Sequence, residues 1–243
     1  MMDLRNNSYE NTGAQVAQGT VAKAFMANVF SWMTLALIVS GVFAYLFGTS
    51  AQLLSYIIDF ETGRMTAFGW IAMLAPFIMV MIMGMRFQKL SYGSMVLLFA
   101  GFSSLMGISL STIFVVYTMS SIASVFFITA ATFGAMALIG YTTKTDLTKF
   151  GSLLFMALIG IIIASIVNWF LRSPGMDYVI SILGVLIFTG LTAYDVQKLK
   201  RIGSGIEYQN EATNKLVIMG ALSLYLDFVN LFLFLLRIFG DRR

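Results

Sequence analysis

Seven separate stretches of this chain are apolar over about 18 residues or more, the length that a helix needs to cross roughly 30 Å of hydrocarbon. They lie near residues 24–48, 67–86, 93–117, 121–142, 150–171, 178–199 and 216–239. Spans of this length have to be helical, because lipid offers backbone groups no hydrogen-bonding partners. The composition agrees, since 59% of the residues are hydrophobic and 11% are charged. The sequence therefore predicts an all-α integral membrane protein, a bundle of seven transmembrane helices.

The chain divides into a polar tail at 1–23, a transmembrane domain at 24–240 and a short tail at 241–243. The first twenty residues lack the basic start, apolar core and cleavage site of a signal peptide, so we expect the first span to be an uncleaved anchor. The third and fourth spans are separated only by 118–120, which predicts a tight helical hairpin. No soluble domain is expected.

The orientation is predicted from Lys and Arg, because cytoplasmic loops hold an excess of both. The side of the N-terminus carries Arg5, Lys23, Arg86, Lys89, Lys144, Lys149, Lys198, Lys200, Arg201 and Lys215, and the opposite side carries Arg64, Arg172, Arg237, Arg242 and Arg243. This predicts a cytoplasmic N-terminus and an external C-terminus. The basic end "RIFGDRR" favours a competing topology with six spans and a re-entrant segment. The pI near 9.3 is read as this topology signal, and no nucleic-acid partner is expected.

The seventh apolar stretch carries a carboxylate, Asp227, about twelve residues from its start. An ionised Asp at mid-bilayer costs about 2.5–3.5 kcal/mol on insertion scales, so it needs a partner, water or a proton. Its neighbours one turn away are Ser223 and Asn230, with Gly220 further along the same face. This small and polar face is predicted to point into the bundle.

The other acidic residue in apolar surroundings is Asp195, near the end of the sixth stretch. Lys198 lies three residues on, so a simple boundary ion pair is one interpretation. Because the sixth and seventh spans are antiparallel neighbours, the alternative is that Asp195 faces Asp227. At 1.5 Å per residue, Asp195 lies about 7 Å from Lys200 while Asp227 lies about 18 Å from Lys215. The pair meets only if the seventh helix starts above the membrane surface or tilts, or if the sixth breaks early.

Two facing carboxylates in a dry site cannot both ionise cheaply, so one proton would be shared. The chain has no histidine, and such a pair is how it could respond to pH near neutrality. Carboxylates are also the hard oxygen ligands that Ca²⁺ prefers, but two of them fall short of the six to eight oxygens of a tight site. Weak, transient coordination suits permeation. No tightly bound cofactor is expected, and the absence of cysteine excludes thiolate metal sites.

Small residues recur every fourth position in two spans, which predicts close helix packing. The two stripes are Ser103, Gly107 and Ser111 in the third span, and Gly160, Ala164 and Asn168 in the fifth.

Several segments together resemble the Bax inhibitor (TMBIM) family of membrane proteins. They are "AYDVQKLK", "ALSLYLDFVNLFLFLLRIFG", "VFSWMTLALIVSG" and "GISLSTIF", and the likeness runs from about Ala24 to Gly240. The resemblance implies a seven-helix bundle with the last helix central and a pH-sensitive Ca²⁺ leak in which an aspartate pair, here Asp195 and Asp227, senses protons. The short tails resemble those of bacterial members, which implies the inner membrane.

The resemblance also implies that a basic residue ending the second span, here Arg86, latches against the aspartate pair in the closed state. Some bacterial relatives hold a membrane Glu about three turns before that residue. Here the stretch reads "MLAPF", so Ala75 and Pro76 stand without a carboxylate, and Pro76 offers a kink instead.

Two other functions remain open from the sequence. A regulatory protein that binds membrane-protein partners, of the stress or cell-death type, is compatible with any helical bundle. An intramembrane aspartyl protease would share "AYD", but its Gly-x-Gly-Asp and Pro-Ala-Leu segments are missing. We therefore expect a channel rather than an enzyme.

Overall fold

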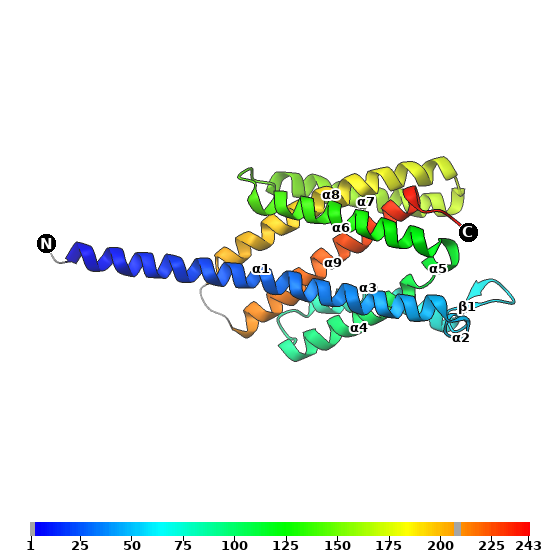
Figure 1. The fold of residues 1–243 in the computed structure, drawn as a ribbon, viewed down its shortest axis with the longest axis horizontal. Helices are drawn as coiled ribbons and strands as arrows, with labels where there is room; N and C mark the ends of the chain where they lie inside the picture. Colours follow the sequence, from blue (N-terminus) through cyan, green and yellow to red (C-terminus); the bar gives the residue numbers. More distant parts are fainter. Residues whose placement is uncertain (1–2, 207–209) are drawn as a thin grey trace.

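The computed structural model describes residues 3–206 and 210–243, with side chains from residue 20 onward (Figure 1). Its elements are α1 (Asp3–Thr49), α2 (Ala51–Leu54), β1 (Ile58–Asp59), β2 (Arg64–Met65), α3 (Ala67–Met85), α4 (Tyr92–Leu110), α5 (Ile113–Val116), α6 (Met119–Thr142), α7 (Thr148–Leu171), α8 (Pro174–Ser204) and α9 (Glu211–Phe239).

The prediction of seven spanning helices is confirmed for the part of the chain that the structure describes. The spans are Thr20–Thr49, Ala67–Met85, Tyr92–Val116, Met119–Thr142, Thr148–Leu171, Pro174–Ser204 and Glu211–Phe239. The last is one unbroken helix that is long and apolar enough to span, which favours seven spans over the alternative of six spans and a re-entrant segment. The two ends of the chain accordingly lie at opposite ends of the bundle (Figure 1). Below, the end that holds the C-terminus is called the C-terminal end, and the opposite one the N-terminal end.

Polar residues in the short links fix where several helices begin. Ser91, Thr118, Ser173 and Asn210 each precede a helix, and each side chain accepts a hydrogen bond from a backbone N–H in the first turn. Such caps satisfy donors that a helix start leaves unpaired. The link before Thr118 is as short as expected, but α4 packs on α1, α3 and α9 whereas α6 packs on α8 and α9, so the prediction of a tight hairpin between the third and fourth spans is wrong.

The antiparallel hairpin of β1 and β2 was not predicted. Ile58 pairs with Met65 and Asp59 with Arg64, and Gly63 adopts a positive φ in the turn between them. The pairing is too short for an alternating pattern to reveal it in the sequence.

The last helix, α9, is the centre of the bundle, as predicted. It packs against α1, α4, α6 and α8 and holds more buried residues than any other described helix. Tyr225 at its middle is fully buried. By contrast, α7 lies at the periphery with most of its apolar side chains exposed, as expected where a helix faces lipid. The most deeply buried helix is therefore the one that carries Asp227.

Three contacts define the antiparallel register of α8 against α9. At one end, Gly184 gives the ring of Phe234 the space that a Cβ would fill. In the middle, Asp195 meets Ser223. At the other end, Gly220 leaves space for the side chain of Leu199. A Cβ on Gly220 would lie 2.7 Å from Cδ2 of Leu199. In this register Asp227 lies one helical turn from the position opposite Asp195.

One of the two small-residue stripes packs as predicted. A Cβ on Gly107 would lie 2.4 Å from the backbone oxygen of Ser40, so α4 approaches α1 closely there. The prediction is wrong for the fifth span, because Gly160 has no atom of another element within 4 Å of its Cβ position. Gly160 on α7 faces outward, so its small size does not bring another helix closer.

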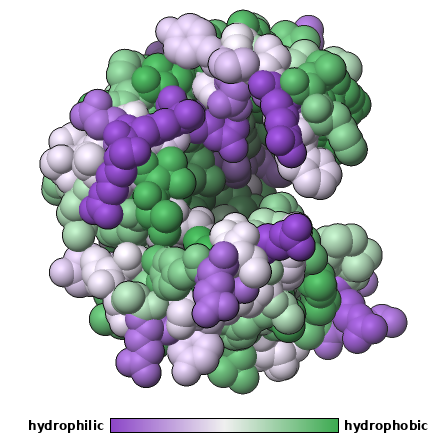
Figure 2. Space-filling model, turned by 90° about the vertical axis from the view of Figure 1, so that its right-hand side faces the viewer, coloured by the Kyte–Doolittle hydropathy of each residue, from purple (hydrophilic) through white to green (hydrophobic). Residues whose placement is uncertain are grey.

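The bundle has two halves with α9 between them, one formed by α1, α3 and α4 and the other by α6, α7 and α8 (Figure 1). Viewed onto the C-terminal end, the surface is hollowed between the halves (Figure 2). A groove between α1 and α6 is lined by apolar side chains, among them Leu37 and Phe126, and Phe228 of α9 lies at its inner part.

Candidate functional site: a buried carboxyl pair

Asp195 of α8 and Asp227 of α9 lie together inside the bundle. Each is only 6% exposed. Their carboxyl groups act on each other electrostatically, which places them close together. The sequence-based expectation that the two residues face each other is therefore what the structure shows.

The hydrogen bonds of this pair are incomplete. The Ser223 hydroxyl donates to Oδ2 of Asp195 at 2.5 Å. Oδ1 of Asp195 and Oδ2 of Asp227 are the only buried side-chain polar atoms of the described residues without a hydrogen-bond partner. Since carboxylate oxygens only accept, two facing ionised groups would leave both atoms unsatisfied. A proton on one of the two carboxyl groups would turn that group into a donor for the other.

The sequence places Asp195 and Asp227 at different depths along their spans, and the geometry of α9 explains how they still meet. This helix starts at Glu211, five residues before the predicted boundary, and is inclined to α8 (Figure 1). The sixth span does not break early, because α8 continues to Ser204. Of the routes by which the pair could meet, the structure therefore uses the early start and the tilt of the seventh helix.

A cavity of about 310 Å³ opens beside the pair. Asp195, Lys198 and Ser223 line it, together with Val80 from α3 and apolar residues of α8 and α9. Lys198 makes no ion pair with Asp195 within the described residues, which does not support the boundary ion pair considered from the sequence. The carboxylate of Asp195 therefore borders an open volume, while Asp227 lies deeper.

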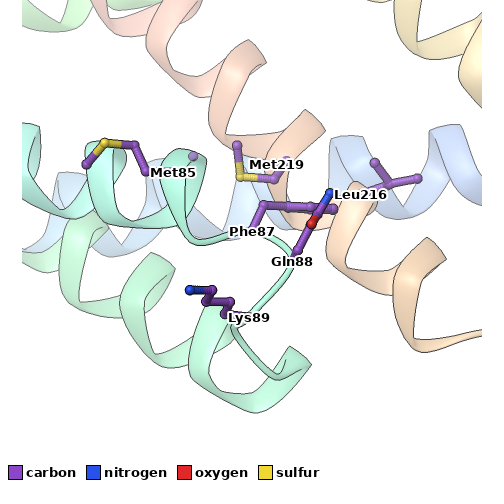
Figure 3. A pocket seen from close by; sticks show the side chains of 7 residues that line it. Met85, Phe87, Gln88, Lys89, Leu216 and Met219 are labelled. Carbon is purple, nitrogen blue, oxygen red and sulfur yellow. The ribbon is translucent and has the colours of Figure 1, made fainter.

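A second cavity of about 640 Å³ lies nearer the N-terminal end. Figure 3 shows Phe87 and Gln88, from the link between α3 and α4, beside Leu216 and Met219 of α9. Leu216 and Met219 line both cavities, so the two adjoin. The smaller cavity borders Asp195, and the larger one lies on its N-terminal side.

The start of α9 is fastened to the wall of this second cavity. The ammonium of Lys215 donates to the carbonyl oxygens of Phe87 and Leu90 at 3.2 and 3.0 Å. Glu211 accepts from the backbone N–H of Tyr92 at 2.9 Å. These bonds fix the link between α3 and α4 against α9 at the mouth of the cavities.

Two predicted site residues lie outside the carboxyl pair. Arg86 caps the end of α3, is exposed, and forms no ion pair with any residue that the structure describes. Asn230 donates to the carbonyl oxygen of Leu226 within its own helix. Of the predicted polar face, Ser223 contacts the pair and Asn230 does not.

A second buried polar cluster was missed by sequence reasoning. Ser40 of α1 donates its single hydroxyl hydrogen to the carbonyl oxygen of Ser103 at 2.7 Å, so Tyr225 of α9 donates to Oγ of Ser40, also at 2.7 Å. The signal was present, since Tyr225 lies two residues before Asp227 in an apolar stretch. Tyr225 connects α9 to α1 and α4, whereas Asp227 connects it to α8.

Metal binding by the pair would be weak. The described residues contain no group of three or more carboxylate, imidazole or thiol side chains placed to hold a metal ion. Two carboxyl groups and one hydroxyl supply fewer oxygens than a tight Ca²⁺ site requires. The chemistry available here is proton exchange and passing contact with a cation.

The fold and the site define a seven-helix integral membrane protein whose central helix carries one member of a buried carboxyl pair. The sequence model of the family described as "Inhibitor of apoptosis-promoting Bax1" matches residues 22–243, and the chain belongs to this Bax inhibitor family. The chain is 47% identical to the inner membrane protein YbhL of Escherichia coli strain K12 over 222 residues, 91% of this chain and 93% of the relative. Proteins of Borreliella burgdorferi and Rickettsia prowazekii are 45% and 42% identical, covering 92% and 91% of this chain and 94% and 91% of theirs.

Proposed function

We propose that this membrane protein is a pH-sensitive leak pathway for cations, with Ca²⁺ as the permeant ion and the pair of Asp195 and Asp227 as its proton sensor. The observation that carries the proposal is a pair of buried carboxyl groups in which one oxygen of each, Asp195 Oδ1 and Asp227 Oδ2, has no hydrogen-bond partner. Removal of a shared proton would leave two like charges in contact, which is unfavourable in a low-dielectric interior. The ionised pair would therefore require a compensating positive charge, from a cation or from a basic side chain.

The adjoining cavities support access to the sensor from one side. In this proposal, water and cations reach Asp195 from the N-terminal end by way of these cavities. Beyond Asp227, toward the C-terminal end, α9 buries Leu231, Phe232, Leu235 and Leu236. Apolar side chains of this kind block a hydrated ion, so the described conformation corresponds to a pathway open at one end and closed at the other.

The choice of cation follows from the ligands. Carboxylate and hydroxyl oxygens are hard donors, which favour Ca²⁺ over softer ions. Their small number keeps binding weak, and a permeant ion has to leave its site as readily as it enters. No tightly bound cofactor is part of the mechanism.

Arg86 takes the role of a gating latch in this proposal. It ends α3, the helix whose Val80 borders the cavity beside Asp195. A shift of α3 toward α8 would bring its guanidinium to the carboxyl pair, and a partly ionised pair would attract it more strongly than a neutral one. In the structure the Arg86 side chain is exposed and forms no ion pair with a described residue, so latching would require this shift.

We place the protein in a bacterial inner membrane with the N-terminus in the cytoplasm. The membrane follows from the printed name of the Escherichia coli relative. The orientation follows from the ten basic residues on the N-terminal side against five on the other. The cavities beside Asp195 then open to the cytoplasm, so the sensor would report cytoplasmic pH.

The test is Ca²⁺ flux in proteoliposomes that contain a Ca²⁺-sensitive dye, measured between about pH 6 and 8, where a shared proton can titrate without histidine. Asp195→Asn and Asp227→Asn each leave one titratable carboxyl group, and we expect both to lose the pH dependence. Asp146→Asn is the matched control, because it removes a carboxylate at the N-terminal end that is 68% exposed and far from the pair in sequence.

Unchanged pH-dependent flux in both pair variants would refute the sensor, and absence of flux in the wild type would refute the pathway. The second result would favour the other candidate, a regulatory membrane protein that acts through partners. Co-purification of partners from native membranes by wild type and by the two pair variants separates these functions.

A further inference from the structure

A pocket at the C-terminal end gathers most of the basic side chains of that end. This end carries only five basic residues, and all five are arginines. Three of them, Arg172, Arg237 and Arg242, line one cavity of about 360 Å³. They come from three different elements, namely the end of α7, the last turn of α9 and the C-terminal tail.

The pocket carries uncompensated positive charge. Arg237 pairs with Asp177 at 3.7 Å, and Asp177 also lines the pocket. Neither Arg172 nor Arg242 forms an ion pair with any residue in the described ranges. Two guanidinium groups are thus available to an anion, beside neutral donors and acceptors from Asn168 and Ser173.

Arg172 is held in place by an unusual backbone conformation. It has φ 50° and ψ 37°, and among the described residues it is the only one other than glycine with positive φ. Glycine suits this conformation better, because a side chain costs about 1 kcal/mol or more there. The turn is fixed by the backbone N–H of Arg172, which donates to the carbonyl oxygen of Asn168 at 2.7 Å, and by that of Ser173, which donates to Oδ1 of Asn168 at 3.0 Å. The side chain of Arg172 is therefore aimed by the turn.

The tail that carries Arg242 is also fixed. The backbone N–H of Arg243 donates to the carbonyl oxygen of Val116 at 2.9 Å, and that of Thr118 donates to the carbonyl oxygen of Asp241 at 3.1 Å. On the other side, the backbone N–H of Asp241 donates to Oγ of Ser121 at 2.9 Å. Arg242 is thus presented by a segment bonded to the start of α6.

Side chains that favour the lipid interface flank the pocket. Trp169 and Phe170, in the turn before Arg172, are 72% and 74% exposed, and Tyr178, which lines the pocket, is 57% exposed. Exposed aromatic residues at the end of a spanning helix mark the level of the lipid headgroups. Figure 2 shows hydrophilic groups on the upper half of the C-terminal end directly beside hydrophobic ones. The pocket therefore lies where the phosphate of a membrane lipid would be.

We infer that this pocket binds the phosphate group of an anionic phospholipid, with Arg172 and Arg242 as its ligands. Guanidinium groups match phosphate oxygens through paired hydrogen bonds, which the point charge of a lysine does not form. The volume is within the range of small-ligand pockets, about 300–1,000 Å³. The lipid would join α7 and α8 to the C-terminal tail from outside, independently of the carboxyl pair.

The experiment uses Trp169 as the reporter, in a Trp32→Phe, Trp70→Phe background that leaves no other tryptophan. The protein is placed in phosphatidylcholine nanodiscs with increasing brominated phosphatidylglycerol, which quenches tryptophan fluorescence when bound nearby. We expect saturable quenching, and about ten-fold more lipid for half-saturation in Arg172→Gly or in Arg242→Gln, each of which loses one charge-assisted contact. Arg172→Gly suits the positive φ, so it removes the guanidinium without straining the turn.

Arg64→Gln is the matched control, because Arg64 is an exposed arginine of the same end and does not line the pocket. Wild-type lipid dependence in Arg172→Gly and Arg242→Gln, or an equal loss in Arg64→Gln, would overturn the site. Brominated phosphatidylethanolamine that quenches as well as phosphatidylglycerol would overturn the preference for a net anion. Full competition by millimolar inorganic phosphate would reassign the pocket to a soluble anion.

Discussion

Ser223 donates its hydroxyl hydrogen to Asp195 across the interface of α8 and α9, one turn along α9 from Asp227. The bond joins the two helices about one turn from the point where Gly220 and Leu199 bring them close. The pair of carboxyl groups is thus held by a neutral donor on one side and by each other on the other. Its hydrogen bonding remains one proton short of complete.

The first prediction concerns Ser223→Ala. The substitution leaves Oδ2 of Asp195 buried without a donor, which typically costs about 1–3 kcal/mol. We expect that loss in the free energy of unfolding, measured by equilibrium denaturation in mixed micelles. Ser165→Ala is the control, because that hydroxyl bonds only the carbonyl oxygen of Ile161 in its own helix. Equal stability of the two variants would contradict a structural role for the bond across α8 and α9.

The second prediction compares two glycines. Gly107→Ala places a Cβ 2.4 Å from the backbone oxygen of Ser40, so α1 and α4 have to separate. We expect a loss of about 1–3 kcal/mol, as for other overpacked sites. Gly160→Ala makes the same chemical change where nothing lies within 4 Å and should stay within about 1 kcal/mol of wild type. Thermal unfolding of both proteins checks this, and a stable Gly107→Ala would show that the close approach is not required.

These glycines also show how far the sequence predicts the fold. The seven spans follow from apolar length alone, because the bilayer imposes one helix length on every crossing. The sequence does not show which of the two glycines packs against a neighbouring helix, because Gly107 and Gly160 both belong to stripes of small residues. The face of a helix that meets a partner depends on the rotation of the whole bundle. Hydropathy carries little of that information where the surroundings of the bundle are as apolar as its interior.

The third prediction concerns Tyr225→Phe. Ser40 keeps its bond to Ser103 but loses the donor from the phenol, so we expect about 0.5–1.5 kcal/mol of destabilisation. The pH dependence of Ca²⁺ flux should remain that of the wild type, because the Tyr225 hydroxyl bonds α1 rather than the carboxyl pair. The same protein is measured by thermal unfolding and by proteoliposome flux. A changed pH dependence would mean that the two buried clusters are coupled through α9.

The sequence predicted the two acidic residues of the candidate site, but it did not predict the residues that line the cavities beside them. Asp195 and Asp227 stand out because a carboxylate is expensive in an apolar stretch. The cavities beside them are lined by Val80, Leu216 and Met219, which look like any other lipid-facing or packing residues. The early start of α9 at Glu211 also escaped prediction, because its first turns are polar and extend beyond the apolar stretch.

The last prediction separates surface titration from the buried pair. Hydrogen bonds from the side chain and the backbone N–H of Thr148, with a smaller contribution from Arg201, lower the pKa of Asp146 from 3.8 to about 2. A lowered pKa stabilises the fold fully above the unfolded value, and this contribution is lost as the pH falls from about 4 toward 2. Between about pH 6 and 8 Asp146 is ionised in both the folded and the unfolded chain, so its contribution is constant there.

Asp146→Asn should therefore shift stability by the same amount at every pH above about 5 and converge with wild type below about 4, as read from thermal unfolding across that range. Its flux should keep the wild-type midpoint between about pH 6 and 8, because no proton is exchanged at this site there. A moved midpoint would assign the pH response to the link between α6 and α7, where Arg201 contacts Asp146 at 2.8 Å, instead of the interior of the bundle. An unmoved midpoint would be consistent with the proposed sensor, the carboxyl pair inside the bundle.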